Sequence, residues 1–423
     1  HSPGQLIAAR ALMGIGGAAI MPVTLSIISN VFDPRERGRA IGVWAGAVGM
    51  AVAIGPIVGG TLLEKFWWGS VFLINLPIVA GGLVAVAILV PESRDPKPGR
   101  VDATGVLLSV AGLVSLVYGI IDGGEHGFGR PSVWAWIFAG IAILAGFIAF
   151  ERRITYPSLD VKLFNNPRFS AATAASGLMF FAAFGVFFFM AFYLQLVRGY
   201  SPLQSGLLVV PFAVAQMIFA PRSAAMVKRF GAKAVCAVGI GLAGVGIAGT
   251  ALVGVDTPIW IVAALFFVQG AGMANVMPAT TESIMSALPR EKAGVGSAVS
   301  NTVRQVASAL GVAVLGSVLS AVYRSDVADA IASLPAPARA AAGESLSGAY
   351  AVGAGLGPNG PAVVNAANDA YVGAMHWAAG VGVLIAALGV AVVLAWLPGR
   401  PSRPVEAVEP QVSTGEPELA PVS

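Results

Sequence analysis

The feature that most constrains the fold is a succession of long apolar stretches separated by short polar loops. A helix needs about 20 mostly apolar residues to cross the roughly 30 Å hydrocarbon core of a bilayer. Only 11% of the residues are charged and 57% are hydrophobic, whereas about a quarter of a soluble domain is charged. The stretches predict an all-α integral membrane protein with eleven spanning helices, at residues 6–29, 40–62, 68–90, 103–121, 132–150, 169–195, 203–226, 232–254, 258–282, 296–321 and 371–397.

The loops on the two sides of these helices differ in charge. If the loop at 33–39 is cytoplasmic, eighteen of the 25 Lys and Arg residues fall on its side and five on the other. The positive-inside rule then places the N-terminus outside and the C-terminus in the cytoplasm. The basic residues form no continuous stripe, so we expect no nucleic-acid partner. The chain opens at His1 without a signal-peptide pattern, and this start predicts that an odd number of helices precedes it.

One predicted helix carries the sequence AVAIGPIVGG at residues 51–60. Proline removes a backbone donor and glycine removes side-chain bulk, so such a helix bends and presents a flat face. In a membrane, small residues let two helices approach closely. The sequence therefore predicts either a helix that moves against a neighbour or a static packing face, built on Gly55, Pro56, Gly59 and Gly60.

The chain also contains an internal repeat. Residues 10–37 resemble residues 266–292, and five residues recur at a constant offset: Gly14, Gly16, Ala18, Met21 and Pro22 match Gly270, Gly272, Ala274, Met277 and Pro278. Both segments end in a similar charged turn, which predicts that the two helices run in the same direction. Parallel repeats are typical of secondary transporters whose two halves move about a site near the membrane midplane. Chance similarity between two Gly/Ala-rich helices is the alternative.

These motifs resemble those of the major facilitator superfamily, in particular its drug:proton antiporter branch with fourteen spanning helices, which includes multidrug and antiseptic-resistance efflux pumps. Arg10 with Gly14, Gly16 and Pro22 is similar to the fourth-helix signature of that family, and the Gly-Pro helix is similar to its fifth-helix antiporter motif. The resemblance implies that the first three of fourteen helices are absent. It also implies proton antiport by alternating access, driven by a proton gradient without a cofactor.

The resemblance and the loop pattern together divide the chain into four parts. We expect the remainder of an N-terminal helix bundle at 1–90, an inserted helix pair with cytoplasmic linkers at 91–168, and a C-terminal bundle at 169–397. Within the last part, the Ala-, Gly-, Pro- and Ser-rich segment 322–370 is predicted to be a mostly flexible outer loop. The Pro/Glu-rich tail at 398–423 is predicted to be disordered.

Three charged residues within or near the predicted helices are candidates for proton coupling. A cation at the centre of a spanning helix costs about 2.5–3.5 kcal/mol, so Arg10 should face a partner or a wet cavity, where it would favour the charged form of a nearby carboxylate. The alternative is that the Arg10 side chain extends to the outer headgroups of the membrane and has no role in coupling. Arg304 is the second candidate. Glu282 is either a proton carrier or an interfacial carboxylate.

Polar and aromatic residues predict a cavity for the transported molecule. Asn301, Arg304 and Gln305 share one helix face, which serves either substrate contact or interhelical hydrogen bonding. Phenyl rings can bind bulky cations through cation–π attraction; the alternative is that these rings contact lipid or pack against other helices. The candidate cavity residues are Asn301, Gln305, Gln216, Gln269, Asn275, Phe184 and Phe188.

Enzyme signatures are missing from the sequence. It has no Gly-x-Ser-x-Gly motif and no phosphate-binding loop, and its three His residues are not clustered. The Asp122, Glu125 and His126 cluster does not have the spacing of a zinc site, so we expect no metal.

The prediction is a monomeric, multi-pass cell-membrane transporter that exports hydrophobic or cationic small molecules in exchange for protons. Two alternatives stay open: a symporter or uniporter on the same scaffold, and a non-transporting membrane sensor or inactive truncated chain.

Overall fold

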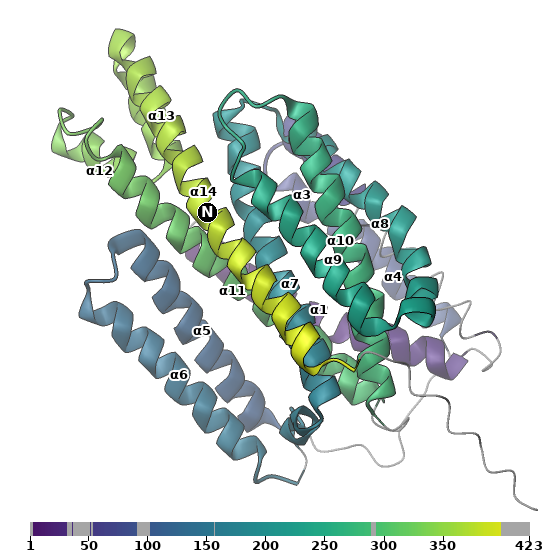
Figure 1. The fold of residues 1–423 in the computed structure, drawn as a ribbon. Coiled ribbons are helices and arrows are strands. Elements are labelled where there is room, and N and C mark those ends of the chain that lie inside the picture. Colours follow the sequence, from purple (N-terminus) through teal and green to yellow (C-terminus); the bar gives the residue numbers. More distant parts are fainter. Residues whose placement is uncertain are drawn as a thin grey trace, which may run out of the picture.

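The chain forms helices joined by short connections (Figure 1). The computed structural model describes residues 3–31, 36, 51, 54–90, 102–155, 157–288 and 293–398. Within these ranges, nine helices are long and apolar enough to span a bilayer. The prediction of an all-α membrane protein is confirmed. The predicted helix at 40–62 is described only at residue 51 and from 54 onward, and the predicted tail lies outside the described residues except for its first residue.

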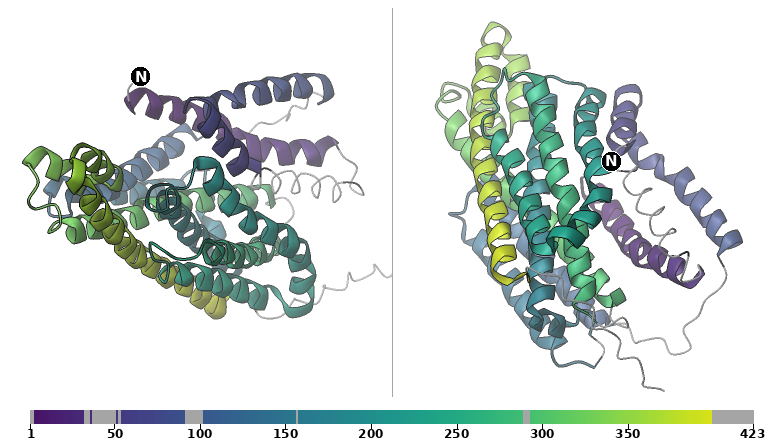
Figure 2. Two further views of the ribbon diagram at one scale, coloured as in Figure 1. Left: turned by 90° about the horizontal axis from the view of Figure 1, so that it is seen from above. Right: turned by 45° about the vertical axis from the view of Figure 1, so that its right-hand side comes forward.

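The N-terminal part contains α1 (Pro3–Val31), a helix at 54–65, the short α3 (Ser70–Leu73) and α4 (Asn75–Leu89). Figure 2 shows these helices together on one side of the larger helix bundle. No residue of α4 is buried, and its Leu, Ile and Val side chains are exposed. Such a continuous apolar surface suits contact with lipid.

The C-terminal bundle is formed by six long helices and contains the main hydrophobic core. α10 packs on α8 and α9, α7 packs on α11, and α14 contacts α7, α9 and α11. A short 3₁₀ helix precedes α7, and a π-helical turn, Tyr193–Val197, ends it. The six helices are α7 (Pro167–Phe192), α8 (Pro202–Phe230), α9 (Ala232–Thr250), α10 (Ile259–Ser286), α11 (Ala293–Val327) and α14 (Gly360–Trp396).

Local sequence signals set where these helices begin and how closely they pack. Ser201 and Gln204 form a capping box at the start of α8, with Pro202 at its first turn. Asn166 caps α7 by accepting hydrogen bonds from the backbone of Arg168 and Phe169. Between α7 and α11, a methyl group at Gly311 would overlap the carbonyl oxygen of Phe181, so only glycine allows this approach.

The inserted pair, α5 (Ala103–His126) and α6 (Pro131–Glu151), forms a hairpin that packs on α11. Figure 1 shows the hairpin beside the C-terminal bundle. Asp102 begins α5 by accepting a 2.8 Å hydrogen bond from the backbone of Gly105. At the other end of α5, the Ser317 hydroxyl of α11 donates to the carbonyl oxygen of Ile120 at 2.8 Å.

Hydrogen bonds between connections show which helix ends lie together. Asn166, before α7, donates to the carbonyl oxygen of Ala287, after α10, at 3.0 Å. At the opposite end, Arg198, after α7, donates to the carbonyl oxygen of Thr257, before α10, at 2.9 Å. We call the second end, which carries residues 124–131, 197–202 and 327–346, the outer end, because the loop charges predict that it faces away from the cytoplasm.

The segment at 322–370 differs from the flexible loop that the sequence predicts. α11 continues to residue 327, two short helices follow, α12 (Ala336–Glu344) and α13 (Leu346–Gly355), and α14 begins at Gly360 after a 3₁₀ turn, Gly357–Asn359. The segment has its own apolar contacts, because Ile331, Leu346 and Val363 are buried in the core. The hydroxyl of Tyr323 also donates to the carbonyl oxygen of Ala342 at 3.0 Å. Pro337 in the first turn of α12 permits helix formation instead of breaking it, and Ser345 caps α13 by accepting a hydrogen bond from the backbone of Gly348.

Candidate functional site

Arg304 lies well inside the spanning part of α11, eleven residues after Ala293. At a rise of 1.5 Å per residue, it is about 16 Å along the helix axis from that end. Its Nη1 atom is 3.4 Å from the sulfur of Met277 on α10, and its guanidinium carbon is 5.8 Å from the ring centre of Phe180 on α7. Among the described residues, no carboxylate oxygen lies within 4 Å of this guanidinium. The Phe180 ring offsets about 0.5–2 kcal/mol of the cost of the charge.

A stripe of phenylalanines on α7 begins at Phe180. Phe184, Phe188 and Phe192 follow at intervals of four residues and therefore lie on one helix face. The rings of Phe180 and Phe184 stack with centres 5.8 Å apart, and those of Phe188 and Phe192 meet edge to face at 5.3 Å. Phe184 is 42% exposed and Phe188 is 37% exposed. We call these four residues the aromatic stripe; its open ring faces are available to another molecule.

Other aromatic rings of α7 have a packing role. Phe187 lies 5.0 Å from Phe212 and 5.5 Å from Phe266, measured between ring centres, and belongs to the hydrophobic core. The two predicted cavity aromatics, Phe184 and Phe188, are thus on the open face, and the neighbouring Phe187 is not. All these phenylalanines lie in one stretch of the sequence, which does not show which helix face packs against a neighbouring helix and which stays open.

Among the predicted amides, only two flank Arg304. Asn301 is half-buried and Gln305 is exposed, both on α11. Gln269 and Asn275 of α10 instead face α9: Gln269 is 2% exposed and packs against Gly246, and Asn275 packs against Gly239 and donates to the carbonyl oxygen of Ala271 at 2.8 Å. These two therefore lie in the α9–α10 contact and not beside Arg304.

The remaining predicted residues of the C-terminal bundle are not joined to Arg304. Gln216 is half-buried on α8. Glu282 is exposed on the last turns of α10, five residues after Met277, and makes no ion pair with any described residue. Met277 was missed by the sequence analysis as a contact of Arg304, although it is one of the repeated residues.

In the N-terminal part, Arg10 is exposed on α1, with its guanidinium carbon 5.5 Å from the ring centre of Phe72. No described carboxylate lies within ion-pair distance of it. Methyl groups at Gly14 and Gly16 would meet no described atom within 4 Å. Pro22 falls within α1, but its side chain lies outside the described residues.

The Gly-Pro helix contacts the start of α8 at the outer end. A methyl group at Gly60 would lie 2.6 Å from the Cα atom of Leu203, and one at Gly206 would overlap the carbonyl oxygen of Pro56. The Ser201 hydroxyl is 3.3 Å from a carboxylate oxygen of Glu64 in the same region. Backbone therefore meets backbone between the two parts of the chain, and we call this the outer contact.

The four motif residues are not equivalent in the outer contact. Gly60 is buried and Pro56 is half-buried against α8, whereas a methyl group at Gly55 or Gly59 would meet nothing within 4 Å among the described atoms. Gly206 was missed by the sequence analysis. The small pair Ser205-Gly206 in the first turns of α8 is its only sequence signal, because the facing helix is far away in the chain.

The fold and the site together define a polytopic helical membrane protein, in which α7 presents open aromatic rings near Arg304 of α11 and two parts of the chain meet through glycines. Residues 1–312 match the profile of the Major Facilitator Superfamily. The chain belongs to this superfamily and has a transporter fold, not that of an enzyme. The predicted resemblance is thereby confirmed.

Curated relatives agree with this assignment. The chain is 37% identical to Multidrug efflux pump LfrA of Mycolicibacterium smegmatis, over 83% of this chain and 69% of the relative. It is 34% identical to the Tetracenomycin C resistance and export protein of Streptomyces glaucescens, over 74% of this chain and 59% of the relative. It is 31% identical to Methyl viologen resistance protein SmvA of Salmonella typhimurium, over 88% of this chain and 75% of the relative.

A solved structure shares the fold. It is a bacterial homolog of the human lysosomal transporter Spinster, with a TM-score of 0.51 and 14% sequence identity, and the match covers 90% of this chain and 75% of that one. At this level of identity the likeness concerns the fold alone.

Proposed function

We propose that the chain belongs to a drug:proton antiporter that exports hydrophobic and cationic small molecules across the cell membrane, with its C-terminus in the cytoplasm. The names of the relatives support export of toxic compounds, since they include a multidrug efflux pump, a tetracenomycin C exporter and a methyl viologen resistance protein. The protein would act as a monomer and use the proton gradient without a cofactor.

The observation that carries this proposal is the aromatic stripe beside Arg304. Exposed rings at Phe184 and Phe188 offer stacking surfaces for flat apolar molecules, without a fixed set of hydrogen-bonding groups. Such a surface tolerates many shapes, as a multidrug site must. Asn301 and Gln305 add neutral hydrogen-bonding groups on the same side of α11 as Arg304.

Arg304 imposes a preference on where a cationic substrate binds. Two positive charges at about 8 Å repel by about 2 kcal/mol at an effective dielectric constant of about 20. Phe188 is eight residues from Phe180 along α7, which corresponds to about 12 Å of helix. A positive group therefore favours the Phe188 end of the stripe, whereas a neutral ring has no such preference.

The outer contact supports alternating access. It joins the N-terminal part to α8 at the outer end, so a path from the bundle interior to the outside opens when this contact separates. Backbone contact without interlocking side chains forms and breaks at little cost in side-chain entropy. In this proposal Arg10 and Arg304 are the candidates for coupling proton movement to the transition, whereas Glu282, which is exposed and forms no ion pair with a described residue, is more simply an interfacial carboxylate.

The test is efflux of a fluorescent monocationic dye from cells that express the protein from its complete gene, with and without a protonophore. We expect efflux that collapses with protonophore and that is weakened by Phe184→Ala. Phe138→Ala is the matched control, because this ring of α6 is 62% exposed and distant in the chain from the stripe. Efflux that persists after the proton gradient is abolished would exclude antiport and favour a uniporter. Equal losses in both variants would refute the assignment of the stripe.

A further inference from the structure

A charged cavity lies at the outer end, apart from the aromatic stripe. It has a volume of about 410 Å³ and is bordered by the end of α5, the end of α11 and α12. Its charged or titratable lining residues are Glu125, His126, Arg324, Arg339 and Glu344, and Ile331 contributes apolar surface. Nothing in the transport proposal uses this cavity.

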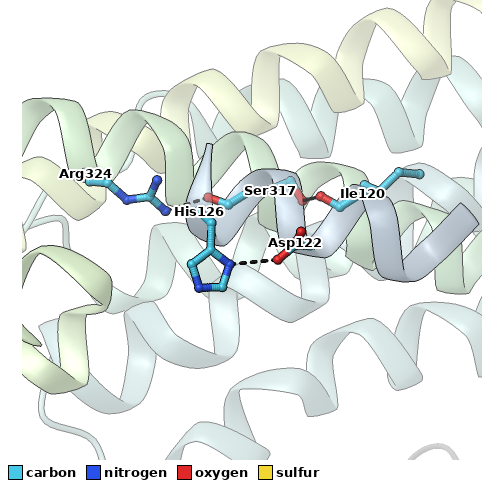
Figure 3. A network of polar contacts seen from close by, with 6 residues as sticks. Ile120, Asp122, His126, Ser317 and Arg324 are labelled. Atoms are coloured by element: carbon cyan, nitrogen blue, oxygen red, sulfur yellow. Dashed lines mark hydrogen bonds and ion pairs between the residues drawn. The ribbon is translucent and has the colours of Figure 1, made fainter. Parts of the chain in front are cut away.

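The walls of the cavity are held together by specific contacts, shown in Figure 3. Arg324 donates to the carbonyl oxygen of Gly124 at 2.7 Å, and Ser317 donates to that of Ile120 at 2.8 Å. A methyl group at Gly124 would lie 2.6 Å from the Cα atom of Ser317, so α5 and α11 touch through their backbones. The inserted pair is thus fixed against α11 at the place where the cavity forms.

The charged side chains that line the cavity form no direct ion pairs with one another. His126 pairs with Asp122 at 2.8 Å. The guanidinium groups of Arg324 and Arg339 form no ion pair with any described carboxylate, and the carboxylates of Glu125 and Glu344 form none with any described cation. Arg324 uses one donor on Gly124, and Arg339 uses one on the carbonyl oxygen of Ala332 at 3.3 Å. A guanidinium has five N–H donors, so most of them stay available. The cavity therefore offers both free cations and free carboxylates.

The level of the cavity in the membrane indicates what it meets. The spanning segments of α5 and α11 end at residues 126 and 327, so the cavity lies at the outer ends of two spanning helices, where we expect the membrane surface. Tyr118 and Ile121, on the last turns of α5 below the cavity, are exposed apolar surface. A ligand with a charged head and an apolar body would find a partner for each part.

We propose that this cavity binds a group that combines a phosphate with a primary ammonium, as in the headgroup of an aminophospholipid. Arg324 and Arg339 would hold the phosphate, which guanidinium groups bind through paired hydrogen bonds. Glu125 and Glu344 would accept hydrogen bonds from the ammonium. A quaternary ammonium has no N–H to donate, and an anionic glycerol headgroup has no cation, so both fit less well.

The experiment is native mass spectrometry of the purified protein with phosphatidylethanolamine, phosphatidylcholine or phosphatidylglycerol added at equal concentration. We expect phosphatidylethanolamine to be retained about three- to tenfold more strongly than the other two, which corresponds to about 0.7–1.4 kcal/mol. Arg339→Gln and Glu344→Gln should each remove most of this preference. These variants are preferable to Arg324→Gln, which also removes the hydrogen bond to Gly124. Arg130→Gln is the matched control, because Arg130 is exposed at the outer end and does not line the cavity.

A second arm separates lipid from a free solute. If glycerophosphoethanolamine, which has the same head without acyl chains, displaces the lipid at comparable concentration, the head alone is recognised and a soluble phosphoamine is a ligand of the site. If it does not, the apolar body is required and the ligand is a lipid. Equal retention of the three lipids, or equal loss in Arg130→Gln and Arg339→Gln, would overturn the proposal. Dye efflux plays no part in this readout, so failure here is distinct from failure of the transport proposal.

Discussion

The outer contact predicts different effects for two adjacent glycines of the same motif. Replacing Gly60 with alanine places a methyl group 2.6 Å from both the Cα atom of Leu203 and the carbonyl oxygen of Pro202, whereas ordinary contacts begin at about 3.4 Å. The helices must therefore separate by about 0.8 Å. Gly59→Ala adds the same methyl group where nothing lies within 4 Å among the described atoms, so it is the matched control.

The size of the effect follows from overpacking. Extra atoms in a closely packed contact cost about 1–3 kcal/mol. If that cost falls on the closed outer contact alone, the population of the open form rises about 5- to 150-fold. Gly206→Ala should act in the same direction, since its methyl group would overlap Pro56 from the other side of the contact.

The assay measures the accessibility of a cysteine at the outer contact. The single native cysteine, Cys236, is buried and is first replaced by alanine. Ser205 precedes Gly206 and is 6% exposed, so Ser205→Cys should react slowly with a membrane-impermeant maleimide. We expect Gly60→Ala to raise the labelling rate at least fivefold and Gly59→Ala to leave it unchanged. Equal rates in the two variants would show that the contact does not control access from outside.

Three further predictions test other contacts. Arg304→Gln should strengthen binding of a monocationic dye to the purified protein about tenfold, because it removes about 1.4 kcal/mol of repulsion at about 12 Å, the distance of the Phe188 end. A neutral analogue should be unaffected and Arg304→Lys should behave as wild type, so equal shifts for both dyes would contradict the electrostatic argument. Tyr350→Phe loses hydrogen bonds to the carbonyl oxygen of Leu196 at 2.7 Å and to Asn368 at 3.1 Å. It should therefore lower the free energy of unfolding, measured by thermal denaturation, by about 1–2 kcal/mol, whereas Tyr118→Phe at an exposed position should not. Glu282→Gln, at an exposed position without an ion pair, should keep efflux within about twofold of wild type, and complete loss would instead make Glu282 a proton carrier.

The sequence predicts the spanning helices well and the structure of the outer segment poorly, and both outcomes depend on whether an apolar run is present. The length of an apolar run is enough to predict a spanning helix, so α7 and α9–α11 lie close to their predicted positions. The segment at 322–370 lacks such a run, and its Gly, Pro and Ser residues predict a loop, although Ala, its commonest residue, favours helices. It is nevertheless helical, because Leu346 and Val363 are buried in the common core and Tyr350 bonds to the end of α7. Tertiary contact of this kind is not visible in local composition.

The internal repeat shows a second limit. Gly14 and Gly16 match Gly270 and Gly272, yet their surroundings differ. Methyl groups at Gly270 and Gly272 would overlap Phe212 of α8 and Ala243 of α9, respectively, whereas those at Gly14 and Gly16 meet no described atom. A shared pattern thus identifies equivalent helices, but the neighbours decide whether a glycine is a contact. The same holds for Gln269 and Asn275, whose polarity predicts a cavity and whose neighbours place them between α9 and α10.

In the proposed alternating access, the two contacts made by α8 indicate which interface should open. Gly206 of α8 meets Pro56 of the Gly-Pro helix, and six residues later the backbone of Phe212 meets Gly270 of α10. α10 in turn carries Met277, which touches Arg304. Backbone-to-backbone contacts of this kind do not compress, so a displacement of α8 carries α10 and the Arg304 side with it. The α8–α10 contact continues through two long spanning helices, whereas the described glycine contacts with the Gly-Pro helix lie in the first two turns of α8. In the proposed alternating access we therefore expect the contact between α8 and the Gly-Pro helix to open, and we expect the aromatic stripe to move with α8 and α10 because α7 packs on α10.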